Sequence, residues 1–392
     1  MQEIGKSLIK IRLHRLKNKI TGIVISLFCC GLISCAYAQQ QDVRVQVFHD
    51  ASSLSLKIRG TYEIIDSATL NSLRKGKVLK TTVTVYKDKI LLAGAGFKAR
   101  AMMIKTSSVD EVEINGRVFR GDIELIRHGA LLDVINHIGL EDYVKGISVR
   151  ETSHYWPSEI LKAQAIVFRT YALYKMQERS KKDFDLTSDI YSQAYGGVSA
   201  ERYRINSAVD ETKGKVLAYQ GKIFPAFYHA TCAGHTERAS LVWNIDLAPL
   251  KGVACAFCQG SPHFSWHYVV SLDEIKAQLV KAGYQLDSIE EIAISGRDES
   301  GRIIDLKFSS HKGVLTIPAK DFRNILGPNL IRSTNFSVSI DDTDAVFEGF
   351  GWGHGVGLCQ WGGYFKAKEG YKFDAILQYY YPGAKISSDA AK

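Results

Sequence analysis

The alternation of apolar and polar side chains between residues 42 and 137 most strongly limits what this chain can fold into. Runs such as Val43–Phe48 (VRVQVF) and Thr81–Tyr86 (TTVTVY) repeat every two residues, which is the period of a strand with one buried face. Asn115-Gly116 lies within another such run, and this dipeptide favours a tight hairpin turn. The pattern predicts antiparallel β structure over this segment.

Helical signals gather in other parts of the chain. Pro157 suits the first position of a helix, and apolar residues then recur at helical spacing from Leu161 to Ala172. A second amphipathic helix is expected over residues 272–282, capped by Ser271. Because strand blocks and helix blocks are segregated, the sequence predicts an α+β fold with antiparallel β regions and a few helices.

The first 38 residues have the features of an export signal. Six Lys or Arg residues precede an apolar run over residues 20–33, and Ala36-Tyr37-Ala38 forms a cleavage site. Two alternatives stay open: a lipoprotein signal to residue 34, with Cys35 lipidated, and an uncleaved N-terminal anchor. Each exports the rest of the chain, so we expect contact with a membrane only through this signal or a lipid anchor.

The charge balance limits the class of partner. The formal net charge is +9, and removing residues 1–38 leaves about +4. Such a mild basic bias suits an anionic polymer such as a cell wall. No basic run with interleaved aromatic residues is present, which argues against a nucleic-acid partner.

Two long motifs identify a family resemblance. The first runs from Tyr143 to Tyr174 (YVKGISVRETSHYWPSEILKAQAIVFRTYALY), and the second from Gly349 to Tyr371 (GFGWGHGVGLCQWGGYFKAKEGY). Together with KGKVLAYQGKIFPAFYHATCAGHTE between them, they resemble the SpoIID/LytB family of cell-wall proteins. The resemblance covers essentially the whole chain after the signal.

The resemblance implies an exported lytic transglycosylase in the periplasm or cell envelope. Such an enzyme cleaves the MurNAc–GlcNAc bond of peptidoglycan glycan strands stripped of their stem peptides, and leaves 1,6-anhydro-MurNAc ends. The family also includes amidase enhancers, so the alternative is a non-catalytic wall-binding module that assists a cell-wall amidase. The implied fold is elongated and two-lobed. After the signal, we expect a β-rich subdomain over 39–137, a catalytic core over 138–262, an α/β subdomain over 263–345, and a glycine-rich segment over 346–392 that completes the core.

The family's proposed catalytic acid corresponds to Glu151. Cleavage of a glycosidic bond requires a proton on the leaving oxygen, and an ordinary glutamate is mostly ionised at neutral pH. Burial against apolar rings would raise the pKa, and Tyr155 and Trp156 are close enough in sequence to supply them. One carboxylate suffices if the substrate's C6 hydroxyl is the nucleophile. The alternative for Glu151 is a salt bridge with Arg150 or Arg169.

Further polar and aromatic residues are candidates for binding the sugar chain. The helix after Pro157 carries three of them, which either line the sugar groove or hold the loop of Glu151. The glycine-rich motif would present others on a tight loop. The candidates are Trp156, Gln164, Arg169, Tyr171, Trp352, His354 and Gln360.

Four of the seven cysteines lie beyond the signal. Cys232 and His235 form one pair of possible metal ligands, and Cys255 and Cys258 form a second pair about twenty residues later. This spacing predicts a closed structural Zn²⁺ site. The alternative is a disulfide from Cys232 to Cys255 or Cys258. Cys359 is expected to be a buried small hydrophobic residue, and a Cys359–His354 nucleophile pair is the less favoured possibility.

Overall fold

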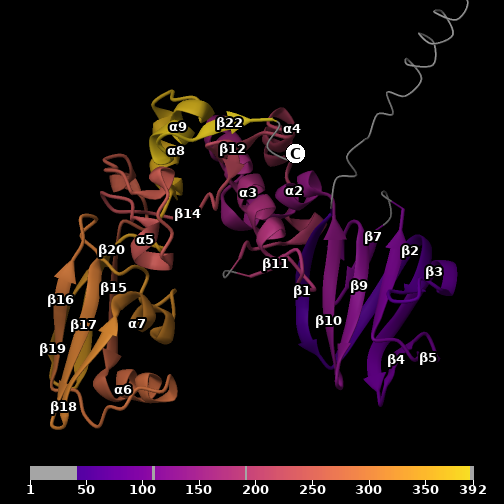
Figure 1. Cartoon of the computed structure of the whole chain (residues 1–392), viewed down its shortest axis with the longest axis horizontal. Helices are drawn as coiled ribbons and strands as arrows, with labels where there is room; N and C mark the ends of the chain where they lie inside the picture. The colour runs from indigo at the N-terminus through magenta and orange to yellow at the C-terminus, as the bar shows by residue number, and fades with distance from the viewer. Residues whose placement is uncertain (1–41, 108–110, 190–191, 389–392) are drawn as a thin grey trace, which may run out of the picture. The chain divides into compact units, whose positions relative to one another are not determined.

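The computed structural model describes residues 42–107, 111–189 and 192–388, so the predicted export signal lies outside the described residues. Within them the fold is α+β, as the sequence predicts (Figure 1). None of the described helices is both long and apolar enough to cross a membrane.

The predicted N-terminal β region forms one large, mainly antiparallel sheet. Its path is β11-β1-β10-β9-β6-β2-β3-β4-β5, with β7 paired to β2 and to β8; most of these strands are labelled in Figure 1. The strands are β1 Val43–Ala51, β2 Ser53–Asp66, β3 Ser72–Tyr86, β4 Lys89–Leu92, β5 Ala95–Phe97, β6 Ala101–Thr106, β7 Glu111–Ile114, β8 Arg117–Phe119, β9 Asp122–His128, β10 Leu131–Ile138 and β11 Leu186–Thr187.

The predicted hairpin turn at Asn115-Gly116 is confirmed. Ile114 pairs with Arg117, so the loop between β7 and β8 contains two residues. Both have positive φ angles, 48° at Asn115 and 79° at Gly116. A two-residue turn of this hand matches the twist of the strands it joins, and Asn and Gly are the residues that adopt it at least cost.

Helices and short strands follow the large sheet. The helices are α2 Leu140–Glu151, α3 Ser158–Glu178, α4 Tyr203–Glu211, α5 Ala239–Trp243, α8 Gln360–Lys368 and α9 Phe373–Tyr380, with the 3₁₀ turns η1 Gly197–Ala200, η2 Ala248–Leu250 and η3 Cys258–Gly260. The short strands are β12 Val216–Tyr219, β13 Lys222–Ile223 and β22 Lys385–Ser387 in one sheet, and β14 Tyr228–His229 and β21 Leu358–Cys359 in another.

Helix α2 is absent from the sequence prediction, which begins the helical region at Pro157. Its apolar residues Leu140, Tyr143, Val144 and Ile147 have helical spacing and are buried. Pro157 itself is the residue before α3, and its φ of −55° suits that position. The large sheet and these helices share one continuous hydrophobic cluster.

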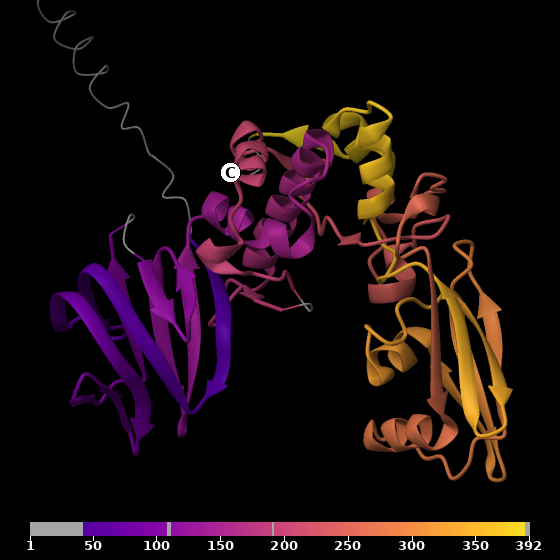
Figure 2. The ribbon, with the colours of Figure 1, turned by 180° about the vertical axis from the view of Figure 1, so that it is seen from behind.

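A second hydrophobic cluster extends from Trp266 to Phe347. Two three-stranded antiparallel sheets and two helices surround it, and both helices lie on the same side of the strands (Figures 1 and 2). The predicted cap of α6 is confirmed, because the Ser271 hydroxyl accepts a hydrogen bond from the Glu274 N–H. The elements are β15 Ser265–Ser271, α6 Leu272–Lys281, β16 Glu291–Arg297, β17 Ile303–Ser310, β18 Gly313–Pro318, α7 Ala319–Leu326, β19 Phe336–Asp341 and β20 Asp344–Phe350.

Candidate active site

Glu151 lies in the wall of a cavity of about 1000 Å³. Residues of α2, α3, α5 and α7 line this cavity together with the segments around His229, Arg302 and His354. Of the predicted binding residues, it includes Tyr171, Trp352, His354 and Gln360. The fold therefore brings the two sequence motifs together at one site.

Glu151 is the last residue of α2, and its side chain is half-buried. Its Oε1 accepts a hydrogen bond of 2.6 Å from the Ala194 N–H, and the carboxylate also accepts one from the Tyr228 hydroxyl. Burial nevertheless raises the pKa of Glu151 above its ordinary value. The cost of removing the charged carboxylate from water exceeds the stabilisation that these two hydrogen bonds give it. Compared with an exposed glutamate, the equilibrium of Glu151 is therefore shifted toward the protonated form.

A chain of hydrogen bonds orients the Tyr228 hydroxyl. The Tyr143 hydroxyl donates to Gln193 Oε1 at 3.0 Å, and Gln193 Nε2 donates to the Tyr228 oxygen at 3.4 Å. The Tyr228 proton is therefore free to point at Glu151. The sequence analysis did not identify Gln193 or Tyr228, and only the position of Tyr228 inside the quoted motif FYHATCAGHTE hinted at it.

The prediction that Tyr155 shields Glu151 is wrong. The Tyr155 side chain is 76% exposed. Trp156 packs instead on Trp361 and Tyr364, with ring centroids 5.0 and 5.1 Å apart, and it does not line the cavity. Nearness in sequence misled here, because the chain turns away after α2 and the shielding rings come from other segments.

Gln360 holds the backbone of Glu151. Its side chain is buried, and Nε2 donates to the Glu151 carbonyl oxygen at 3.1 Å. That carbonyl is at the C-terminal end of α2, where helix carbonyls lack partners within the helix. Gln360 therefore satisfies an end group of α2 and fixes where its last residue lies.

His354 is a neutral hydrogen-bonding residue at the cavity wall. Its Nδ1 accepts from the Val356 N–H at 3.1 Å, so the other ring nitrogen carries the proton, which is donated to the Tyr228 carbonyl. Burial and the neighbouring His229 ring hold the pKa of His354 well below its usual range. His354 thus supports the strand that carries Tyr228 and does not supply a positive charge.

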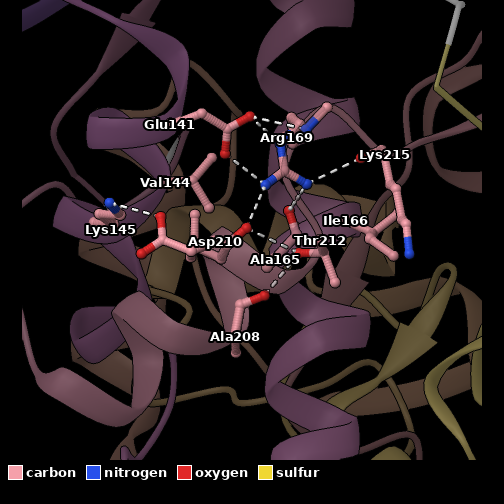
Figure 3. A network of polar contacts seen from close by, with 12 residues as sticks. Glu141, Val144, Lys145, Ala165, Ile166, Arg169, Ala208, Asp210, Thr212 and Lys215 are labelled. Carbon is pink, nitrogen blue, oxygen red and sulfur yellow. Dashed lines mark hydrogen bonds and ion pairs between the residues drawn. The ribbon is translucent and has the colours of Figure 1, made fainter.

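Arg169 and Gln164 do not line the cavity, so the structure gives no support to the prediction that they contact the sugar chain. Arg169 is fully buried and forms a two-point ion pair with Glu141, at 3.0 Å from Nε and 2.7 Å from Nη2 (Figure 3). It also donates to the carbonyls of Lys215 and Val209. Gln164 is buried too, and no partner for its side-chain amide occurs among the described residues. Both lie in a stretch of α3, residues 163–172, in which every residue is buried.

Aromatic rings that the sequence analysis did not single out form part of the cavity wall. Trp243 of α5 is 40% exposed and stacks on Phe227, with centroids 4.1 Å apart and an interplanar angle of 25°. Trp243 also meets the edge of the His354 ring at 4.8 Å. Arg150 lines the same cavity beside Glu151 and is exposed. An exposed ring that faces a cavity offers the apolar face of a sugar a place to pack.

The four cysteines beyond the signal meet at one point in the interior. The Sγ atoms of Cys232, Cys255, Cys258 and Cys359 all lie within 4.8 Å of one another. The expected ligand His235 is not in this group, because its ring turns to the Thr236 carbonyl, 2.7 Å from Nδ1. Cys359, which we expected to be isolated, takes the fourth position.

Comparison with known proteins assigns the family. A family model described as stage II sporulation protein, SpoIID, matches residues 128–219. An uncharacterized protein of Brachyspira hyodysenteriae is 31% identical over 90% of this chain and 94% of its own length. The stage II sporulation protein D of Bacillus subtilis is 28% identical over 64% of this chain and 76% of its own. The chain belongs to the SpoIID family.

This SpoIID-family chain has two further matches. The amidase enhancer of Bacillus subtilis is 24% identical over 86% of this chain and 53% of its own length. A second model, described as a domain of unknown function, matches residues 255–357. The SpoIID match contains Glu151 and Gln193, whereas Trp352 and His354 fall within the second match. The candidate site thus draws on both matched regions and on Tyr228, Trp243 and Gln360, which lie outside them.

Proposed function

We propose that this protein is an exported lytic transglycosylase that cleaves the MurNAc–GlcNAc bond of peptidoglycan glycan strands. The observation that carries the proposal is the half-buried Glu151 carboxyl, which has a raised pKa and lines a cavity whose wall includes the exposed ring of Trp243. Membership of the SpoIID family and its similarity to an amidase enhancer and to stage II sporulation protein D support a role in the cell wall.

In the proposed reaction, one carboxyl group acts twice. Protonated Glu151 gives its proton to the glycosidic oxygen as the bond between that oxygen and C1 of MurNAc breaks. The resulting carboxylate then takes the proton of the MurNAc C6 hydroxyl, whose oxygen bonds to C1. The products are a 1,6-anhydro-MurNAc end and a GlcNAc hydroxyl, and Glu151 ends in its starting protonation state.

The surrounding residues suit this cycle. The Ala194 N–H and the Tyr228 hydroxyl donate to the carboxylate, so they stabilise its charge after the first proton transfer. Gln360 fixes the backbone of the acid, and Trp243 offers a sugar ring a flat apolar surface. We assign proton transfer to Glu151 alone and positioning to the others.

The test is product analysis on glycan strands without stem peptides. We expect mass spectrometry to find 1,6-anhydro-MurNAc ends with the purified protein. Glu151→Gln should lower the rate by a factor of at least about 10²–10⁴, the usual contribution of a general acid. Glu111→Gln, which changes an exposed glutamate of β7 outside the cavity, is the matched control.

Two other outcomes would reject the proposal in different ways. Reducing MurNAc ends would indicate hydrolysis by water. Binding to insoluble peptidoglycan that is equal in both variants, without soluble products, would favour the second candidate function, an amidase-enhancing wall binder. The amidase enhancer of Bacillus subtilis, which matches most of this chain, is the observation behind that candidate.

A further inference from the structure

The cysteine cluster has the geometry of a closed metal site. Its four thiols come from separate segments: one after β14, two from the turn that contains η3, and one at the end of β21. Each of the four residues is at most 1% exposed. A tetrahedral Zn²⁺ with Zn–S bonds of about 2.3 Å requires sulfur atoms roughly 3.8 Å apart. The cluster is compact enough to close around such an ion, with a Cys232–Cys258 separation of 3.5 Å and all sulfur atoms within 4.8 Å of one another.

Backbone N–H groups point at the sulfur atoms. The Cys232 N–H and the Gly362 N–H both donate to Cys359 Sγ, each at 3.3 Å. The second of these bonds caps α8, so Cys359 Sγ lies at the positive end of a helix dipole. Donors of this kind stabilise a thiolate over a thiol, and they are the usual surroundings of metal-bound sulfur.

Lys366 places a buried ammonium group in the same region as the cluster. Lys366 is 2% exposed, and its Nζ lies 3.8–3.9 Å from the ring centroids of Phe257, Tyr371 and Tyr379. No ion pair with a carboxylate holds Lys366 among the described residues, and burial lowers the pKa of its ammonium group. Buried charges are normally paired. Four thiolates around Zn²⁺ carry a net charge of −2 and would supply the counter-charge.

We propose that Cys232, Cys255, Cys258 and Cys359 bind one structural Zn²⁺ through four sulfur atoms, with Cys359 in the place that spacing gave to His235. Four protein ligands leave no open position, so the ion holds the fold and takes no part in the chemistry. Two disulfides among the same residues are the competing arrangement. They would remove every thiolate and with them the negative charge that the metal site would offer to Lys366.

We further infer that the metal site holds Glu151 in position. The importance of that position for catalysis rests on the proposed function. Cys359 directly precedes Gln360, whose side chain donates to the Glu151 carbonyl. The strand pairing of β14 with β21 sets Tyr228 opposite Leu358 and His229 opposite Cys359. An ion bound at Cys232 and Cys359 therefore fastens both strands beside the acid.

Metal content tests the site without reference to activity. We expect the full chain, purified under reducing conditions, to contain one zinc per molecule by elemental mass spectrometry. Co²⁺ in its place should show the sulfur-to-metal charge-transfer absorption of a four-sulfur site. Cys359→Ser should lose or weaken the metal and alter that spectrum, whereas His235→Ala should retain both.

A thiol titration keeps the proposal testable even if Cys359→Ser does not fold. In a chain with Cys29, Cys30 and Cys35 replaced by serine, a mercurial reagent should release the zinc only as four thiols react. Release of metal with fewer thiols, loss of metal in His235→Ala, or metal-free protein with disulfide-linked cysteines would each overturn the site.

The coupling to Glu151 has its own readout. Removal of the metal by a chelator should speed hydrogen exchange at the Trp361 and Gly362 amides, which are bonded to the Ala230 carbonyl and to Cys359 Sγ. Unchanged exchange there, with zinc bound as expected, would refute the coupling but not the site. Absence of transglycosylase products in a fully metallated protein would refute the proposed function and leave the metal site standing.

Discussion

Replacement of Arg169 by methionine should destabilise the protein while leaving its affinity for glycan unchanged. Arg169 is 1% exposed in its side chain, and its partner Glu141 is 15% exposed. The substitution removes two charge-assisted hydrogen bonds to Glu141 and those to the carbonyls of Lys215 and Val209 (Figure 3). Methionine fills much of the same space but donates nothing.

The loss of unfolding free energy depends on how well Glu141 is stabilised once Arg169 is removed. Removing one partner of a buried ion pair usually costs about 3–5 kcal/mol, because the other charge stays in the interior unpaired. Glu141 is partly exposed and keeps a hydrogen bond of 3.1 Å from the Gly214 N–H. We therefore expect the lower end of that range, about 3 kcal/mol of unfolding free energy.

Urea unfolding followed by helical circular dichroism measures this loss. Arg202→Met, which changes an exposed arginine that donates only to nearby carbonyls, is the matched control and should change stability by less than about 0.5 kcal/mol. The double variant with Glu141→Gln should lose less than the sum of the single variants, because each single change leaves a charge unpaired. A loss below about 1 kcal/mol together with weaker glycan binding would show that Arg169 contacts substrate and that the reasoning is wrong.

Three further predictions concern the cavity. Gln360→Ala should lower kcat by up to about 100-fold with little change in KM, because it removes the hydrogen bond to the Glu151 carbonyl. An unchanged kcat would show that Gln360 does not position Glu151. Trp243→Ala should weaken binding to glycan strands by about 1 kcal/mol in a pull-down titration. Tyr203→Ala, which removes an exposed ring outside the cavity, should leave binding unchanged. Equal effects of the two variants would show that a sugar ring does not pack on Trp243. Because Glu151 must be protonated to act, activity should fall as pH rises through its raised pKa. Tyr228→Phe removes a hydrogen bond that lowers this pKa, so the fall in activity should move to higher pH. A move to lower pH would contradict the assignment.

Local patterns in the sequence predicted much of the secondary structure, although not α2, and part of the site. The two-residue period predicted the large sheet, and Asn115-Gly116 predicted its hairpin turn. The spacing of Cys255 and Cys258 marked both as ligand candidates, and the motif around Glu151 marked the acid. These signals are readable because a strand, a turn or a pair of chelating residues depends on positions only a few residues apart.

The partners of those residues were decided by the tertiary structure. Tyr228 and Cys359 reach their places through the pairing of β14 with β21, two segments far apart in the chain. Spacing favoured His235 because it is near Cys232, and nearness favoured Tyr155 for the same reason, yet the backbone turns both side chains elsewhere. Which face of a helix is buried likewise depends on what packs against it, and this places Arg169 in the interior. A contact between distant segments leaves no periodic trace in either one, so only the folded chain reveals it.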